Sequence, residues 1–277
     1  MPAKQSTVTL SDGRAMPQLG LGVWRTPQDV AAEVVKTALE AGYRSVDTAA
    51  IYGNERGVGE GLRTAGVDRE QVFVTTKLWN DNQGFDSALT AFDKSLGRLG
   101  LEAVDLYLIH WPAPKKDLYL DSWRAMIRLK EEGRARSIGV SNFAVEHLQR
   151  LIEETGVTPA VNQIELHPSF QQRALRAFHE ENGIHTMSWS PLGQGRQLED
   201  PVVAEIATKH GKTAAQVVIR WHLDNGLIVI PKSVTPSRIR ENAQVFDFAL
   251  DPQDLDRLAA LDQAGGRIGP DPMTADF

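Results

Sequence analysis

The chain has 277 residues, a formal net charge of -6 and no cysteine. This length fits one large domain, and the lack of cysteine excludes disulfides, a thiolate nucleophile and cysteine-ligated metal sites. The acidic balance speaks against a nucleic-acid binder, whose basic face would be its first electrostatic sign. The polar start, from Met1 to Ser11, has no apolar signal-peptide core, and no apolar run is long enough to span a bilayer. We therefore expect a cytoplasmic protein without membrane contact.

The first structured segment is predicted to be a β-hairpin. Two short runs, Thr7–Leu10 and Arg14–Gln18, flank Ser11, Asp12 and Gly13. An Asp-Gly pair supports the positive φ angles of a tight turn. Because the hairpin precedes every helix, we expect it to plug one end of the domain that follows.

Beyond the hairpin, strand-like and helix-like segments alternate eight times. The strands are expected at Leu19–Val23, Arg44–Asp47, Val72–Lys77, Val104–His110, Ser137–Ser141, Ala160–Glu165, His185–Ser190 and Leu227–Lys232. The helices are expected at Pro27–Ala41, Glu55–Ala65, Ser87–Gly97, Ser122–Glu132, Val145–Thr155, Gln171–Asn182, Val202–Leu223 (interrupted at Gly211) and Pro236–Ala243. A final helix at Pro252–Leu261 and a loose tail from Gly265 to Phe277 complete the chain.

The strand-like runs are apolar on both faces, which is typical of parallel strands covered by helices. Eight such units, joined by right-handed crossovers, predict an α/β fold of the (β/α)8 TIM-barrel type. No flexible linker interrupts them, so residues 1–277 form one predicted domain. A doubly wound open sheet is the alternative, but it would need Gly-x-Gly-x-x-Gly, and Gly20-Leu-Gly-Val-Trp-Arg25 lacks the last glycine. The second glycine cluster, Gly57–Gly61, lies within a predicted helix and indicates close helix packing.

Four side chains with acid–base chemistry follow three successive strands. Asp47, Lys77 and His110 end these strands, and Tyr52 lies in the loop after the first of them. Because the carboxyl ends of barrel strands share one rim, we expect these catalytic candidates to meet. The Lys77 ammonium should lower the pKa of Tyr52, ordinarily about 10, while Asp47 holds the ammonium in place. Tyr52 would then protonate a carbonyl oxygen that His110 orients.

Three other reaction classes fit the same residues less well. A Schiff-base lysine needs a lowered pKa, whereas Asp47 favours the charged form of Lys77. A metal-dependent hydrolase would need clustered histidines, and no two of the seven histidines lie within two residues of each other. A glycosidase would need two facing carboxylates, and only Asp47 and Glu165 stand at strand ends. Asp47 fits better as the ion-pair partner of Lys77 than as a glycosidase carboxylate.

Tryptophans crowd the expected rim. Trp24, Trp79, Trp111 and Trp189 each fall at or just after the end of a predicted strand. This placement favours an apolar pocket in which a flat ring can stack, with ordinary core and rim packing as the alternative.

The end of the last strand predicts an anion site. Thr235 and Pro236 look like the N-cap and first residue of a helix. Arg238 then lies in the first turn, where the helix dipole disfavours a cation unless an anion is bound, and Lys232 is near. Barrels often bind phosphate near their last two strands. A surface salt-bridge patch is the alternative interpretation.

Together these motifs resemble the aldo-keto reductases. The matching segments, in chain order, are Gly42-Tyr-Arg with Asp47-Thr-Ala and Tyr52-Gly-Asn-Glu55, Thr76-Lys-Leu-Trp79, Leu108-Ile-His-Trp-Pro112, Ser137–Phe143, Asn162-Gln-Ile-Glu165 and Ile230-Pro-Lys-Ser233. The resemblance runs from about residue 7 to residue 262. Within the family, the chain most resembles the bacterial 2,5-diketo-D-gluconate reductases. It implies a (β/α)8 barrel, no metal, and NADPH lying extended across the rim without a Rossmann domain.

The resemblance also assigns roles to individual residues. Asp47, Tyr52, Lys77 and His110 correspond to the catalytic tetrad. Trp189 would stack on the nicotinamide, where many members have tyrosine. The remaining cofactor contacts would come from Ser141, Asn142 and Gln163 at the carboxamide, from Ser190, Pro191, Leu192, Gly193, Gln194 and Gly195 at the pyrophosphate, from Lys232, Ser233 and Arg238 at the 2′-phosphate, from Glu241 and Asn242 at the adenine, and from Val234 and Thr235.

The predicted substrate pocket contains Trp24, Trp79, His110 and Trp111. In this family the loop after the last helix helps select the substrate, and the short tail here predicts an open pocket with broad carbonyl tolerance. The predicted protein is a monomer that uses NADPH to reduce an aldehyde or ketone, such as 2,5-diketo-D-gluconate to 2-keto-L-gulonate. A broad-specificity aldehyde or methylglyoxal reductase is one alternative. A non-catalytic NADPH-sensing subunit that binds a partner is the other.

Overall fold

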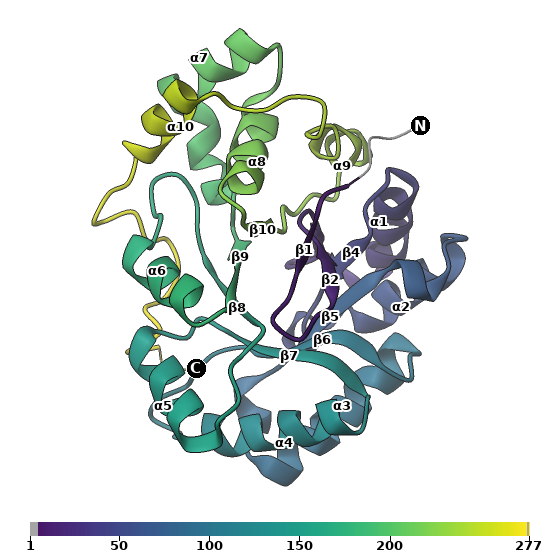
Figure 1. Cartoon of the computed structure of the whole chain (residues 1–277). Helices are drawn as coiled ribbons and strands as arrows, with labels where there is room; N and C mark the ends of the chain where they lie inside the picture. The colour runs from purple at the N-terminus through teal and green to yellow at the C-terminus, as the bar shows by residue number, and fades with distance from the viewer. Residues whose placement is uncertain (1–4, 276) are drawn as a thin grey trace.

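Eight parallel strands form one curled sheet in the order β10-β9-β8-β7-β6-β5-β4-β3 (Figure 1). The computed structural model describes residues 5–275 and residue 277. The first four residues of the predicted polar start, and Asp276 of the predicted tail, lie outside this description. The strands are β3 (Leu21–Gly22), β4 (Ser45–Asp47), β5 (Phe73–Leu78), β6 (Val104–Ile109), β7 (Ala135–Ser141), β8 (Val161–Glu165), β9 (His185–Trp189) and β10 (Ile228–Val229).

Backbone hydrogen bonds join the two edge strands of this sheet. The Gly20 N–H donates to the Val229 carbonyl at 2.9 Å, and the Gly22 N–H donates to the Pro231 carbonyl at 3.1 Å. These bonds make isolated parallel bridges between the first and last strands. The sheet therefore closes on itself, which confirms the predicted (β/α)8 barrel and excludes the open doubly wound sheet.

Helices lie around the outside of the strands (Figure 1). They are α1 (Gln28–Glu40), α2 (Glu55–Thr64), α3 (Phe85–Leu99), α4 (Tyr119–Glu131), α5 (Val145–Thr155), α6 (Arg173–Glu181), α7 (Pro201–His210), α8 (Ala214–Asp224), α9 (Pro236–Asn242) and α10 (Pro252–Ala259). Their ends differ from the predicted ends by at most three residues. The predicted break at Gly211 is real, because this residue has a φ of 62° and ends α7. The core lies between the sheet and this helical layer, where Trp123 and Trp221 are buried.

Short 3-10 turns complete the loops at η1 (Ala50–Tyr52), η2 (Arg69–Gln71), η3 (Asn80–Asn82) and η4 (Gly193–Glu199). Within residues 5–275 and 277, no helix combines the length and the apolar character needed to cross a bilayer.

The N-terminal hairpin closes the amino end of the barrel, as predicted. Its strands β1 (Thr7–Thr9) and β2 (Ala15–Pro17) pair antiparallel. Leu10 and Met16 are buried and belong to the same apolar cluster as residues of β6 and β9. The Arg14 side chain donates to the carbonyl of Arg136, near the amino end of β7. The hairpin thus leaves the carboxyl rim of the barrel free for chemistry.

The glycine cluster of α2 allows close helix packing, which confirms its interpretation. A Cβ atom added at Gly57 would lie 2.6 Å from the carbonyl oxygen of Gln28 in α1. At Gly59 it would lie 2.1 Å from the carbonyl oxygen of Leu99, at the end of α3. Helix α2 can therefore approach both neighbours only because these positions lack side chains.

We expect Gly59→Ala to lower the free energy of unfolding by about 2 to 3 kcal/mol, because the new methyl group would overlap a rigid backbone carbonyl. Gly97→Ala in α3 is the matched control, since an added Cβ atom there has nothing within 4 Å. It should leave stability unchanged or raise it by up to about 1 kcal/mol. Urea unfolding measures both, and equal effects of the two substitutions would contradict the packing argument.

Candidate active site

The four predicted catalytic side chains meet at the carboxyl rim. The Lys77 ammonium donates to Asp47 Oδ1 at 2.5 Å and to the carbonyl of Thr48 at 2.9 Å. Its nitrogen lies 5.1 Å from the centre of the Tyr52 ring. The Tyr52 ring meets the His110 imidazole edge-on, with ring centres 5.7 Å apart. Acid, base, phenol and imidazole therefore form one contiguous group.

Asp47 and Lys77 form a buried ion pair. Lys77 is fully buried and only 2% of Asp47 is exposed. The second carboxylate oxygen of Asp47 accepts a hydrogen bond from the Gln163 side chain at 2.8 Å. Since removing charges from water is costly, both groups need these partners to remain ionised. The pair is consequently fixed in position by β4, β5 and β8.

Two residues that follow Tyr52 hold this arrangement from behind. The buried Asn54 side chain donates to two carbonyls of the loop after β3, at 2.9 Å and 3.0 Å, and accepts from the Thr48 hydroxyl at 2.8 Å. The buried Glu55 accepts from the Thr76 hydroxyl and from Arg98, both at 2.6 Å. The sequence motifs assign no role to either side chain. The only sign of their importance in the sequence is that they follow Tyr52 closely in the matching motif.

Tyr52 keeps its proton at neutral pH. Burial raises its pKa well above the usual range, and the negative charge of Asp47 adds to the effect. The prediction that the pKa of Tyr52 is lowered beside Lys77 is therefore wrong, because burial and the Asp47 carboxylate both raise it. Burial also lowers the pKa of Lys77, although Asp47 works in the opposite direction. A protonated phenol beside an ammonium suits proton donation, since the ammonium stabilises the phenolate left behind.

His110 is a neutral imidazole in this site. Burial lowers its pKa well below the usual range, and the charge of Lys77 lowers it further. Its Nδ1 atom is buried and has no hydrogen-bond partner among residues 5–275 and 277. Its backbone carbonyl accepts from the Asn142 side chain at 3.0 Å, which fixes the end of β6 to the end of β7. A neutral imidazole can donate one hydrogen bond to a carbonyl oxygen without bringing a second cation beside Lys77.

The residues expected around a carboxamide lie together at the ends of β7, β8 and β9. The Ser141 hydroxyl donates to the carbonyl of Gln163 at 2.8 Å, and the Trp189 indole donates to Asn142 Oδ1 at 2.8 Å. Asn142 and Ser190 have φ angles of 63° and 47°, in the left-handed region that most residues avoid. Backbone strain of this kind gathers where side chains must be aimed at a ligand.

The expected pyrophosphate loop is compact. Gly193, Gln194 and Gly195 have successive φ angles of 56°, 54° and 99°. The Gly193 N–H donates to the Ser190 carbonyl at 2.9 Å, and the Gly195 N–H donates to the Leu192 carbonyl at 2.9 Å. Two tight turns thus follow Trp189 directly and lead into the rest of η4.

The expected 2′-phosphate residues present unpaired charge. Lys232 and Arg238 are exposed, and in the described part of the chain neither side chain makes a hydrogen bond or an ion pair. The alternative of a surface salt-bridge patch therefore does not hold for these residues. Thr235 does precede α9, but its side chain makes no capping bond. Instead, the Thr235 N–H donates to the Ser233 hydroxyl at 3.1 Å.

The expected adenine residues are tied to the scaffold. The Glu241 carboxylate accepts from the Thr213 hydroxyl at 2.9 Å, at the start of α8. Asn242 is buried at the end of α9. Both residues are therefore held in place, on the same helix as Arg238.

Aromatic rings form the expected substrate side of the rim. Trp79 meets the His110 imidazole edge-on, with ring centres 5.3 Å apart. Phe277 stacks on Trp79 with ring centres 5.7 Å apart, and meets Trp111 edge-on at 5.1 Å. Trp24 differs from this group, since it is 40% exposed and its ring contacts the Arg25 guanidinium.

The C-terminal tail is not loose, contrary to the prediction. Glu165 accepts hydrogen bonds from the N–H groups of Ile268 at 2.6 Å and Gly269 at 2.8 Å. The Asn80 side chain donates to the carbonyl of Phe277 at 3.0 Å. The described tail residues therefore lie across the rim, and the predicted open pocket is wrong on this side. Glu165, the second carboxylate that a glycosidase would need, is used to hold the tail.

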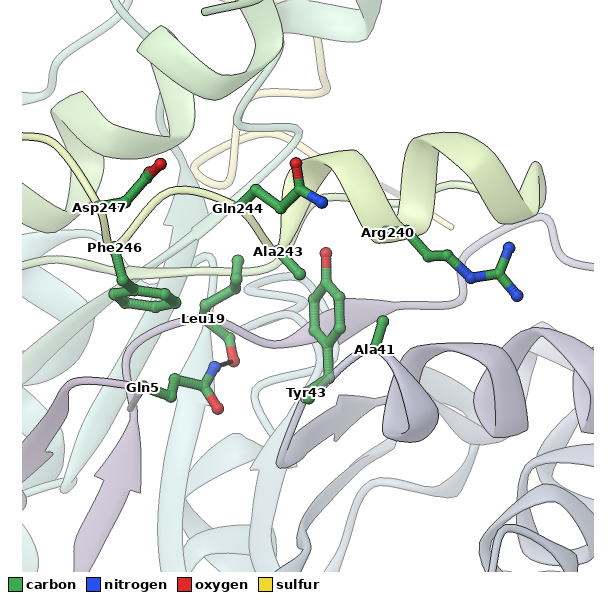
Figure 2. A pocket seen from close by; sticks show the side chains of 10 residues that line it. Gln5, Leu19, Ala41, Tyr43, Arg240, Ala243, Gln244, Phe246 and Asp247 are labelled. Atoms are coloured by element: carbon green, nitrogen blue, oxygen red, sulfur yellow. Dashed lines mark hydrogen bonds between the residues drawn. The ribbon is translucent and has the colours of Figure 1, made fainter. Parts of the chain in front are cut away.

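A separate cavity of about 480 Å³ is lined by none of the four catalytic candidates, and Figure 2 shows the side chains that line it. Gln5, Tyr43, Arg240 and Phe246 are among its lining residues. It lies near the amino end of the barrel, and no predicted site residue lines it. In the described residues, moreover, no three His, Asp or Glu side chains are grouped as metal ligands.

Comparison with known proteins decides the family. The model of the Aldo/keto reductase family matches residues 16–263, which include the whole tetrad. The chain belongs to the aldo/keto reductase family. This confirms the resemblance inferred from the motifs.

Relatives of this aldo/keto reductase cover nearly its full length. The methylglyoxal reductase DkgA of Salmonella typhimurium is 56% identical over 272 residues, which cover 98% of each chain. An aldo-keto reductase of Mycobacterium sp. strain JLS is 56% identical over 270 residues, again 98% of each chain. The crystal structure of apo Gox0644 is 57% identical and superposes with a TM-score of 0.96, over 99% of this chain and 100% of that one.

The His110 imidazole of this aldo/keto reductase should stay neutral over the pH range in which an exposed histidine becomes protonated. An NMR titration should show no shift of its ring proton signal between about pH 8 and about pH 5.5, and His110→Asn assigns the signal. The unfolded chain takes up a proton at this residue near pH 6.5, and the folded chain does not. The free energy of unfolding therefore falls as the pH drops below about 6.5. A midpoint near 6.5 in the folded protein would contradict the assignment.

Proposed function

We propose that this aldo/keto reductase uses NADPH to reduce aldehydes and ketones to alcohols. The observation that carries the proposal is the buried Asp47–Lys77 pair in contact with the Tyr52 ring, which itself touches His110. This constellation fits one chemical task, the delivery of a proton to an oxygen that is gaining negative charge.

The residues on the rim fit NADPH. A Gox0644 mutant that is 56% identical to this chain was crystallised in complex with NADPH, and it superposes with a TM-score of 0.96. Ser141, Asn142 and Gln163 offer polar side chains beside Trp189, as a carboxamide next to a flat ring requires. Lys232 and Arg238 supply unpaired cations for a 2′-phosphate, which NADH lacks. NADPH, when bound, supplies the hydride that reduces the carbonyl carbon.

Each tetrad residue has a distinct role in this proposal. The Tyr52 phenol donates its proton to the carbonyl oxygen, and the neutral His110 imidazole donates a hydrogen bond to the same oxygen. Lys77 stabilises the phenolate that remains until a proton from solvent restores the phenol. Asp47 keeps the ammonium charged and in place. The raised pKa of Tyr52 ensures that its proton is present before the reaction begins.

For the substrate, we propose a small dicarbonyl such as methylglyoxal. Relatives of 55% to 56% identity from Escherichia coli and Salmonella typhimurium are named methylglyoxal reductase. Phe277, stacked on Trp79 and in edge contact with Trp111, narrows the space beside His110 and favours small carbonyls. The larger 2,5-diketo-D-gluconate is the second candidate. The ratio of kcat/KM for the two compounds, measured with NADPH, decides between them.

No observation favours a non-catalytic NADPH-sensing subunit, since all four tetrad side chains are present and in contact. The monomeric state and the cytoplasmic location stay predictions from the sequence.

Tyr52→Phe should reduce the kcat for methylglyoxal by at least about 100-fold, because the proton donor is lost. The affinity for NADPH, measured by quenching of tryptophan fluorescence, should change by less than about twofold, since the phenol oxygen is not a proposed cofactor contact. Tyr43→Phe is the matched control, because its hydroxyl donates to the Ile239 carbonyl at 3.3 Å, away from the tetrad. It should retain turnover. Full turnover by Tyr52→Phe would reject the proposed role.

A further inference from the structure

A buried carboxylate at the end of β8 holds the tail by its backbone. Glu165 is 1% exposed, and its two oxygens accept the N–H groups of Ile268 and Gly269 separately. Burial opposes its charge, but hydrogen bonds from His167, Gly269 and Ile268 more than offset this and lower its pKa. The tail donors thus satisfy a charge that would otherwise be buried without partners.

A chain of side-chain hydrogen bonds runs from Glu165 to the proposed cofactor loop. His167 Nε2 lies 3.1 Å from Glu165 Oε1, and His167 Nδ1 lies 3.1 Å from the Ser169 hydroxyl. The Ser169 hydroxyl accepts from the Gln197 side chain at 2.7 Å. For a neutral imidazole every donor in this chain has one acceptor. Gln197 belongs to η4, which begins with the residues proposed to cover the pyrophosphate.

The tail also packs directly against Trp189 and against Ser169, a member of this chain. A Cβ atom added at Gly269 would lie 2.6 Å from the Trp189 ring, and one at Gly266 would lie 1.8 Å from the Ser169 carbonyl oxygen. At Gly193, in the cofactor loop, an added Cβ atom would lie 2.8 Å from the Gln197 side chain. The tail therefore lies so close to Trp189 and Ser169 that no methyl group fits between them, and we expect a shift of the tail to disturb both residues.

We propose that Glu165, His167 and Ser169 are positioning residues that couple the tail to the loop covering NADPH. Docking of the tail on Glu165 and closure of η4 over the pyrophosphate then stabilise each other, so the tail slows cofactor release as well as narrowing the substrate pocket. The proposal rests on the NADPH site proposed above. Because such coupling is reciprocal, bound NADPH must also stabilise the docked tail.

Two measurements on the full chain test this coupling without turnover. Hydrogen exchange of the Ile268 and Gly269 amides should slow when NADPH binds. In Glu165→Gln the side-chain amide offers one acceptor oxygen where the carboxylate offered two, so this protection should largely disappear. NADPH should also dissociate about tenfold faster from this variant in a stopped-flow experiment that follows tryptophan fluorescence.

Ser169→Ala cuts the chain in its middle and leaves the Glu165 bonds to the tail intact, so it tests the coupling even if Glu165→Gln does not fold. It should speed NADPH dissociation and weaken the effect of NADPH on tail exchange. Glu181→Gln is the matched control, because this carboxylate is exposed on α6 and makes no hydrogen bond to any described residue.

An unchanged dissociation rate in Ser169→Ala, or in a Glu165→Gln variant whose tail amides exchange faster, would overturn the coupling and leave the tail contacts purely structural. A wild-type chain that does not bind NADPH would instead contradict the proposed function, and the inference with it. These two failures are distinguishable because binding is measured before any variant is compared.

Discussion

The ion pair between Asp47 and Lys77 is the interaction on which the rest of the site depends. It spans adjacent strands and is buried, so neither charge is tolerable without the other. Gln163 satisfies the second oxygen of Asp47, which brings β8 and its neighbours into the same arrangement. Burial and the nearby negative charge of Asp47 both raise the pKa of Tyr52, so the phenol stays protonated until a carbonyl oxygen needs its proton.

The sequence predicts the barrel, and the meeting of Asp47, Tyr52, Lys77 and His110 at its rim, because both rest on local patterns. Apolar runs mark parallel strands, and Asp47, Lys77 and His110 stand where these runs end. The raised pKa of Tyr52 could not be predicted in this way, since it depends on how completely the rim excludes water. The position of the tail was also unpredictable, because its bonds to Glu165 come from backbone N–H groups, which carry no signature in the sequence.

The proposed cofactor and substrate sides of the rim are linked by contacts between side chains and the tail. Trp189 donates a hydrogen bond to Asn142 and also contacts the tail at Gly269, so one ring touches both regions. Phe277, from the same tail, lies against Trp79, which meets His110. The hairpin closes the amino end of the barrel with buried apolar side chains, so this end contributes to the stability of the fold. Parallel barrels commonly separate these roles, with the active site at the carboxyl rim and stabilising contacts at the amino end.

A double variant tests the central claim most directly. Asp47→Asn with Lys77→Met removes both charges and leaves neither partner buried alone, so the fold should survive. In a single turnover with NADPH and methylglyoxal, we predict that NADPH oxidation slows by at least about 100-fold. NADPH binding should change by only a few-fold, because the pair is not a proposed cofactor contact. Hydride transfer at the wild-type rate in this variant would contradict the account.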